Sequence, residues 1–135
     1  MKFLDTNILV YVADIRDPLK QRIAEDLVTT ALGTDCFLIS EQVLNEFSSI
    51  ALSKLKISKD AIKEYLKFFR GIATVKFPDH VAERGLDIAE RYQMQFYDSL
   101  LLATAEANDC SEFISEDLND GQIYCGMKIV NPFKA

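Results

Sequence analysis

The chain has 135 residues, of which 49% are hydrophobic and 27% charged, and it contains few Gly and Pro residues. This composition excludes a disordered chain, and the length predicts one globular domain spanning residues 1–135. The formal net charge is −6, and the single His and three Cys residues, in no metal-ligand spacing, exclude a His-rich zinc site.

In chain order, the pattern predicts a strand at 1–5, helices at 8–13 and 18–32, a strand at 36–40, helices at 41–55 and 59–70, a strand at 73–77, helices at 80–94 and 98–108, and strands at 112–115 and 127–130. Thr6 or Asn7 is the predicted cap of the first helix, Ser58 of the fourth and Asp79 of the fifth. Strands separated by helices predict an α/β protein with a parallel sheet and helices on both faces.

Nothing in the sequence predicts contact with a membrane. No uncharged run reaches the roughly 18 apolar residues needed to cross a bilayer. The apolar run after Met1 and Lys2 is interrupted at Asp5, which is not the pattern of a signal peptide. Cysteines without a pairing pattern are typical of reduced thiols. We therefore expect a cytoplasmic protein.

Two acidic residues stand where strands are predicted to end. Asp5 ends the first strand, and Asp117 follows the fourth. In open α/β sheets, ligands bind beyond the carboxyl ends of the strands. We expect the two carboxylates to share one crevice if the first and fourth strands are neighbours.

Two further acidic residues lie on predicted helices. Asp98 opens a helix and shares a face with Leu101, Leu102 and Ala105, so a carboxylate heads an apolar stripe that should be buried. Glu46 lies at the edge of the apolar stripe of its helix. Each acid taken alone also fits an ordinary role, as a helix cap, a solvated flank or a loop residue. Asp14 and several other acids are assigned to solvated helix faces.

Taken together, the four carboxylates point to a metal site. Like charges that converge repel one another and raise one another's pKa, so cations are needed to neutralise them. A site made of carboxylate oxygens selects Mg²⁺ or Mn²⁺ over zinc. Such cations bind phosphodiesters and activate water for hydrolysis. The residues therefore predict a divalent-cation site of a kind that suits phosphodiester hydrolysis.

The chain resembles a PIN domain, specifically the VapC-type toxin ribonucleases of prokaryotic toxin–antitoxin pairs. The motifs that carry the resemblance are Phe3–Leu9, Ser40–Phe47, Tyr97–Leu101, Ser115–Gly121 and Ile129–Phe133. They occur in this order over nearly the whole chain.

The resemblance implies a site, a fold and a set of partners. The family's metal-binding acids fall on Asp5, Glu46, Asp98 and Asp117, supporting polar residues on Thr6, Asn7 and Ser115, and a further acid on Asp120. The implied fold is a five-stranded parallel sheet in the order 3-2-1-4-5. The implied activity is cleavage of single-stranded or structured RNA by metal-activated water, which leaves a 5′-phosphate and a 3′-hydroxyl. A homodimer and a small antitoxin protein are the implied partners.

Several alternatives remain open from the residues alone. A haloacid-dehalogenase-like phosphatase also uses a strand-end Asp with Mg²⁺, but it needs a second Asp where Asn7 stands, and a receiver-type signalling domain needs a pair of acids after the first strand. A PIN-like binding module with a decayed site is a non-enzymatic alternative. The basic segment, which contains Lys54, Lys56, Lys59, Lys63, Lys67 and Arg70, fits either an RNA-binding surface or a solvated helix face.

Overall fold

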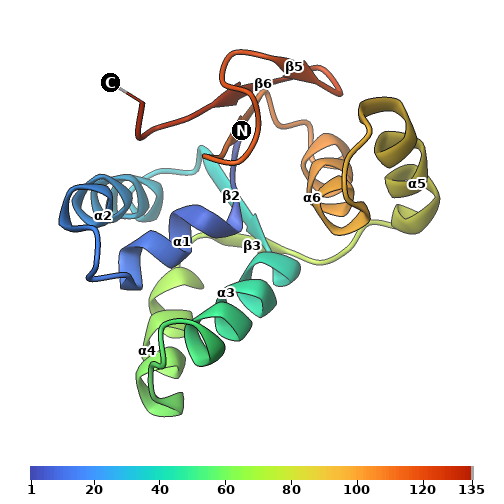
Figure 1. Cartoon of the computed structure of the whole chain (residues 1–135). Helices are drawn as coiled ribbons and strands as arrows, with labels where there is room; N and C mark the ends of the chain where they lie inside the picture. Colours follow the sequence, from blue (N-terminus) through green and yellow to red (C-terminus); the bar gives the residue numbers. More distant parts are fainter. Residues whose placement is uncertain (135) are drawn as a thin grey trace.

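The computed structural model describes residues 1–134, and Ala135, the last residue of the predicted domain, lies outside them. Pairs of helices separate the strands from β1 to β4 (Figure 1), which confirms the α/β class. In chain order they are β1 (Lys2–Leu4), α1 (Thr6–Ala13), α2 (Pro18–Leu32), β2 (Phe37–Ser40), α3 (Glu41–Ser53), α4 (Lys59–Phe69), β3 (Ala73–Val75), α5 (Val81–Tyr92), α6 (Phe96–Ala107), β4 (Glu112–Ile114), β5 (Ile123–Tyr124) and β6 (Met127–Val130).

The sheet has the strand order β3-β2-β1-β4-β6-β5. The pairs from β3 to β6 are all parallel, so the predicted order of five parallel strands is confirmed. The predicted count is wrong by one, because β5 adds an antiparallel edge strand to β6. Cys125 and Gly126 join these two strands with φ values of 52° and 79°, as a two-residue hairpin turn requires. A strand of two residues is too short to show an alternating pattern in the sequence.

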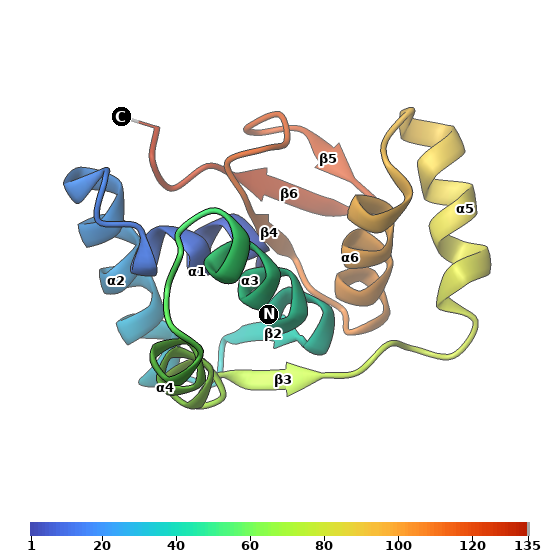
Figure 2. The ribbon, with the colours of Figure 1, turned by 60° about the horizontal axis from the view of Figure 1, so that its bottom comes forward.

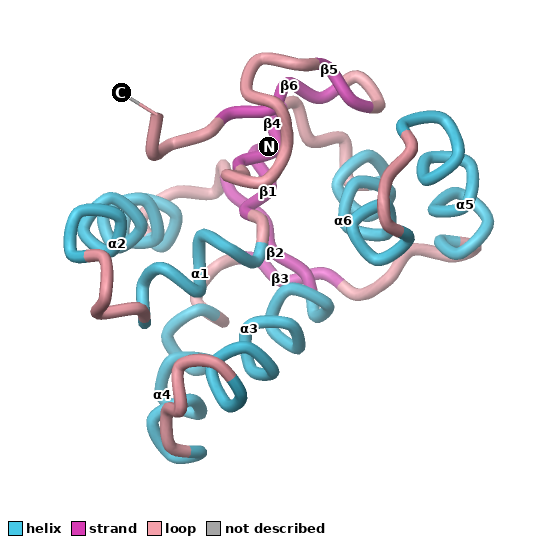
Figure 3. The backbone as a smooth tube through the Cα atoms, viewed as in Figure 1, coloured by secondary structure: helices cyan, strands magenta, loops and turns pink. Residues whose placement is uncertain are grey.

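Helices cover both faces of the sheet, as predicted. On one face α1 packs against α2 and α3, and on the other α5 packs against α6 (Figures 1 and 3). Figure 2 shows β3 at one edge of the sheet and the β5–β6 hairpin at the other. Phe3 of β1 and Phe113 of β4 are buried between the layers, and their stacked rings lie 5.3 Å apart.

Short polar side chains start several helices, although two predicted caps are wrong. Ser58 accepts a hydrogen bond from the backbone N–H of Ala61, which confirms it as the cap of α4. The first helix is capped by Asp5 instead of Thr6 or Asn7. Asp79 does not cap α5, because the residue before that helix is His80, which has a left-handed φ of 57° and makes no side-chain capping bond.

The strand register determines which residues meet at the carboxyl edge of the sheet. Leu4 of β1 lies opposite Ile114 of β4. The next residue of each strand, Asp5 and Ser115, therefore emerges at the same edge, and the Asp5 N–H donates to the Ile114 carbonyl at 3.0 Å. β2 ends at the same edge, where Ser40 leads directly into α3. This edge carries the candidate site.

Candidate functional site

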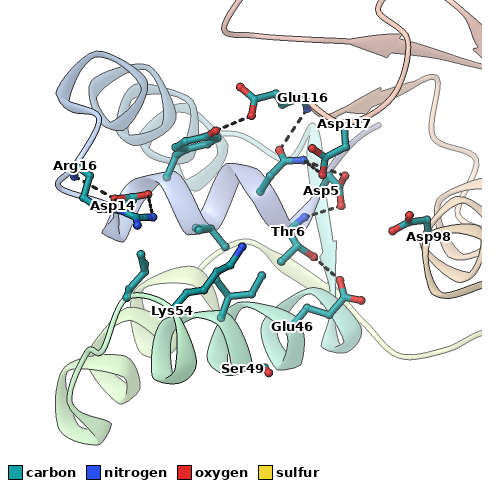
Figure 4. Close-up of a pocket in the computed structure, with 15 residues that line it drawn as sticks. Asp5, Thr6, Asp14, Arg16, Glu46, Ser49, Lys54, Asp98, Glu116 and Asp117 are labelled. Carbon is teal, nitrogen blue, oxygen red and sulfur yellow. Dashed lines mark hydrogen bonds and ion pairs between the residues drawn. The ribbon is translucent and has the colours of Figure 1, made fainter. Parts of the chain in front are cut away.

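A cavity of about 490 Å³ opens at the carboxyl edge of the sheet (Figure 4). The four acids expected to bind metal, Asp5, Glu46, Asp98 and Asp117, all line it. They come from the end of β1, from α3, from the first turn of α6 and from the loop after β4. The fold therefore gathers four carboxylates that lie far apart in the sequence around one space.

Asp5 is the most buried of these acids, with 8% of its surface exposed. One of its oxygens accepts the Thr6 N–H at 2.7 Å, and the other accepts the Ser115 hydroxyl at 2.7 Å. The pKa of Asp5 is raised from its ordinary 3.8 to about 7: burial is the largest cause, the two hydrogen bonds act in the opposite direction, and the charges of Asp117 and Asp98 add to the increase. In the absence of a cation, Asp5 therefore carries its negative charge at the expense of stability near neutral pH.

Polar side chains at the start of α1 donate hydrogen bonds to Glu46 and Asp117. The Thr6 hydroxyl donates to Glu46 Oε1 at 2.6 Å. The Asn7 side-chain amide donates to Asp117 Oδ2 at 3.0 Å and to Ser115 Oγ at 3.2 Å. The three expected supporting residues, Thr6, Asn7 and Ser115, thus all contact one or more of the four acids.

Asp98 faces the cavity from α6 and is exposed to solvent. Partial loss of solvent raises the pKa of Asp98, and the nearby charges of Glu46 and Asp117 raise it as well. Leu101, Leu102 and Ala105, which share its helix face, are buried as the sequence predicted. The buried stripe anchors α6 against the sheet and leaves the carboxylate at the edge of the cavity.

The donor chemistry of the cavity fits a hard divalent cation. The four acids expected to bind metal offer carboxylate oxygens, and the pKa values of two of them, Asp5 and Asp98, are raised by burial and by the charges of neighbouring carboxylates. Their side chains surround the space without meeting at one point: within residues 1–134, no three His, Cys, Asp or Glu side chains are close enough to hold one ion as they stand. Each of three of these carboxylates instead accepts a hydrogen bond from a neighbouring side chain: Glu46 from Thr6, Asp5 from Ser115 and Asp117 from Asn7.

Asp120 is placed away from this group. It does not line the cavity, and its carboxylate accepts the N–H of Asn131 at 2.9 Å and lies 3.9 Å from the ammonium of Lys134. Its contacts connect the loop after β4 to the segment after β6.

The cavity also contains two acids that the sequence analysis did not identify. Asp14 was assigned to a solvated helix face, but it is only 7% exposed and forms an ion pair with Arg16 at 2.8 Å. Glu116 pairs with Lys20 and accepts the Tyr11 hydroxyl at 2.5 Å. Glu116 directly precedes Asp117, and this neighbouring position was the only signal in the sequence that could have revealed it.

The basic segment contributes little to the cavity. Lys54, the residue that ends α3, lines it, and Arg70 is engaged by Glu41 at 2.7 Å. Lys54 has no ion-pair partner in the part of the chain that the structure describes. The other cations of the segment lie on α4 and its preceding loop and do not line the cavity.

Comparison with protein families identifies the chain. The model of the PIN domain matches residues 2–119. The chain belongs to the PIN-domain family. The family assignment, which rests on sequence over most of the chain, replaces the phosphatase and receiver alternatives. A search of curated protein sequences finds no match to this PIN domain.

Solved structures share the fold of this PIN domain. It is similar to a toxin–antitoxin complex from Klebsiella pneumoniae, with a TM-score of 0.74 and 20% identity over 100% of both chains. VapC20 from Mycobacterium tuberculosis, described as a toxin that cleaves the sarcin–ricin loop, gives 0.69 and 14% over 87% of this chain and 92% of its own. VapBC2 from Rickettsia felis, bound to a DNA fragment from its promoter, gives 0.66 and 18% over 95% and 96%.

The length and hydropathy of the helices in this PIN domain bear on contact with a membrane. Across residues 1–134, none is both long and apolar enough to cross a membrane.

Proposed function

We propose that this PIN domain is a divalent-cation-dependent endoribonuclease and the toxin of a VapBC-type toxin–antitoxin pair. The observation that carries the proposal is the cavity at the carboxyl edge of the sheet, which four carboxylates from separate segments face. The family supports nuclease-type activity. The similar folds of toxins and toxin–antitoxin complexes support the assignment to this group.

In this proposal Asp5 and Asp98 are the central cation ligands, and Glu46 and Asp117 complete the site directly or through water. When bound, Mg²⁺ or Mn²⁺ would supply the positive charge that stabilises the phosphodiester oxygens and the activation of the attacking water. The chain itself supplies orientation: Ser115 fixes one oxygen of Asp5, and Thr6 fixes one oxygen of Glu46. Held side chains lose less conformational freedom when a ligand binds.

RNA is the proposed substrate, and Lys54 is the residue of the basic segment that supports its binding. Its side chain points into the cavity from the end of α3 (Figure 4) and has no ion-pair partner within residues 1–134. A backbone phosphate next to the scissile one would meet this cation. Arg16 also lines the cavity, but its guanidinium already donates to both carboxylate oxygens of Asp14.

The proposal also includes the partners expected from the sequence. A small antitoxin protein and a second copy of the chain are expected to bind, in the cytoplasm. One of the similar structures is described as a toxin–antitoxin complex, which supports an antitoxin partner.

The test is cleavage of a single-stranded RNA by the purified protein, with Mn²⁺, with Mg²⁺ and with EDTA. We expect cleavage with either cation, products with 5′-phosphate and 3′-hydroxyl ends, and no cleavage with EDTA. Asp98→Asn should reduce the rate by at least about a hundredfold, as loss of a group that acts in the transition state does. The matched control is Asp26→Asn, which alters an exposed acid on α2 outside the cavity.

Expression in bacterial cells gives a second reading of the same proposal. The wild type should arrest growth, and Asp5→Asn should relieve the arrest. Equal toxicity of the two proteins, or RNA cleavage that persists in EDTA, would remove the catalytic role of the carboxylates. A protein that binds Mn²⁺ and RNA without cleaving would instead be the non-catalytic PIN-like module.

A further inference from the structure

Gln42 forms the only side-chain connection that the structure gives between Glu46 and the start of α6, counted over residues 1–134. It lies in the first turn of α3 and is 7% exposed. Its side-chain nitrogen, Nε2, donates to Glu46 Oε2 at 3.1 Å and to the Tyr97 carbonyl at 2.9 Å. Tyr97 directly precedes Asp98. The Gln42 amide therefore contacts the Glu46 carboxylate and the residue before Asp98.

The orientation of this amide is fixed by its two acceptors. Turning the amide over would bring its oxygen against the Glu46 carboxylate and the Tyr97 carbonyl, neither of which can donate a hydrogen bond. In the observed orientation the oxygen of Gln42 is buried and has no donor among the described residues. An unpaired buried oxygen is unfavourable for folding. The side chain is thus oriented by its two acceptors, and its own oxygen is left without a donor.

Glu46, and Asp98 next to the second acceptor, both line the cavity. Glu46 comes from α3 and Asp98 from α6, and both point toward the space between them (Figure 4). Gln42 itself does not line the cavity. Thr6 holds the second oxygen of Glu46, Oε1, from α1. Gln42 therefore contacts Glu46 and the residue before Asp98 without lining the space in which a ligand would lie.

We propose that Gln42 is a positioning residue that sets the distance between Glu46 and Asp98 and thereby the affinity of the cavity for a divalent cation. The inference rests on the proposed function, because it takes these carboxylates as cation ligands. Hydrogen-bond partners behind ligating carboxylates orient the ligands, and their loss typically weakens metal affinity about 10- to 100-fold.

The test is the Mn²⁺ affinity of Gln42→Met, measured by calorimetry without RNA, together with its thermal unfolding. Met keeps the length of the side chain and removes both donors and the unpaired oxygen. The matched control is Gln21→Met, because the Gln21 amide also donates to a backbone carbonyl, that of Val12 at 3.0 Å, away from the four acids. We expect Gln42→Met to bind Mn²⁺ at least about tenfold more weakly than the wild type. We expect Gln21→Met to bind it as the wild type does.

The unfolding midpoint separates positioning from simple support of the fold. Because Gln42→Met also removes a buried oxygen without a donor, its midpoint should fall no further than that of Gln21→Met. Wild-type Mn²⁺ affinity in Gln42→Met, or equal weakening in both variants, would overturn the positioning role while leaving the proposed function intact. A wild type that binds no Mn²⁺ would overturn both.

Discussion

Replacing Asp5 by Asn should stabilise the metal-free protein, and the gain should grow with pH. Asp5 is nearly buried, and its pKa lies at about 7 in the folded protein against an ordinary 3.8. A carboxyl whose pKa is raised by folding favours the folded state fully below pH 3.8. It loses that contribution as the pH rises through 7. Asn is neutral at every pH and keeps the shape of the side chain.

The size of the effect follows from this difference in pKa. One pH unit of difference corresponds to about 1.4 kcal/mol, so ionised Asp5 destabilises the fold by about 4 kcal/mol well above pH 7. About 2.5 kcal/mol of this should develop between pH 5 and pH 8. Effects of the substitution that do not depend on pH, such as small changes in packing, cancel when the two pH values are compared.

The assay is urea unfolding of the wild type and Asp5→Asn in EDTA at pH 5 and pH 8. The free energy of unfolding of the variant minus that of the wild type should increase between these pH values. Adding Mn²⁺ at pH 8 should stabilise only the wild type, by about 2.7 kcal/mol at a hundred times the dissociation constant. A difference between the two proteins that is the same at both pH values would refute the reasoning that burial and neighbouring carboxylates act on Asp5.

Three further outcomes are expected. Lys54→Ala should weaken RNA binding and reduce the magnitude of the slope of log affinity against log salt by about 0.7, the effect of losing one phosphate contact to a single strand. The control is Lys59→Ala on α4, which should leave this slope unchanged. Both slopes are measured by fluorescence-anisotropy titration. Phe47→Ala should lower the free energy of unfolding by about 3–5 kcal/mol, because its fully buried ring contacts those of neighbouring aromatic residues; a change below 1 kcal/mol in urea unfolding would contradict this. Gly126→Ala should lower the free energy of unfolding by about 1 kcal/mol, because the φ of Gly126 is 79°. Gly33→Ala should not lower it, because the φ of Gly33 is −90°. Equal thermal midpoints of the two variants would argue against strain in the turn.

Within residues 1–134, the local sequence was enough to predict the helices, every strand except β5, and the element ends at which acids stand. Asp5 and Asp117 follow short apolar runs, and parallel strands place their carboxyl ends at one edge, so a shared crevice could be expected on the condition that the first and fourth strands are neighbours. The pairing of β1 with β4 meets this condition. The apolar stripe that follows Asp98 on its helix face could be predicted, because residues three and four positions apart lie on the same face of a helix. The sequence also limited the cation chemistry, because it offers carboxylates and a single His.

Packing between distant segments decided the rest. The pairing of β1 with β4 brings Ser115 to Asp5, and burial at that point raises the Asp5 pKa, which no local pattern encodes. The contact of Gln42 with the Tyr97 carbonyl joins residues 55 positions apart. Asp14 and Asp120 show the same limit. Asp14 was expected on a solvated helix face but lines the cavity, whereas Asp120 was expected beside the four acids but does not line it. Residue type and spacing determine which side chains can take part in a site, but burial and charge depend on which segments the fold brings together.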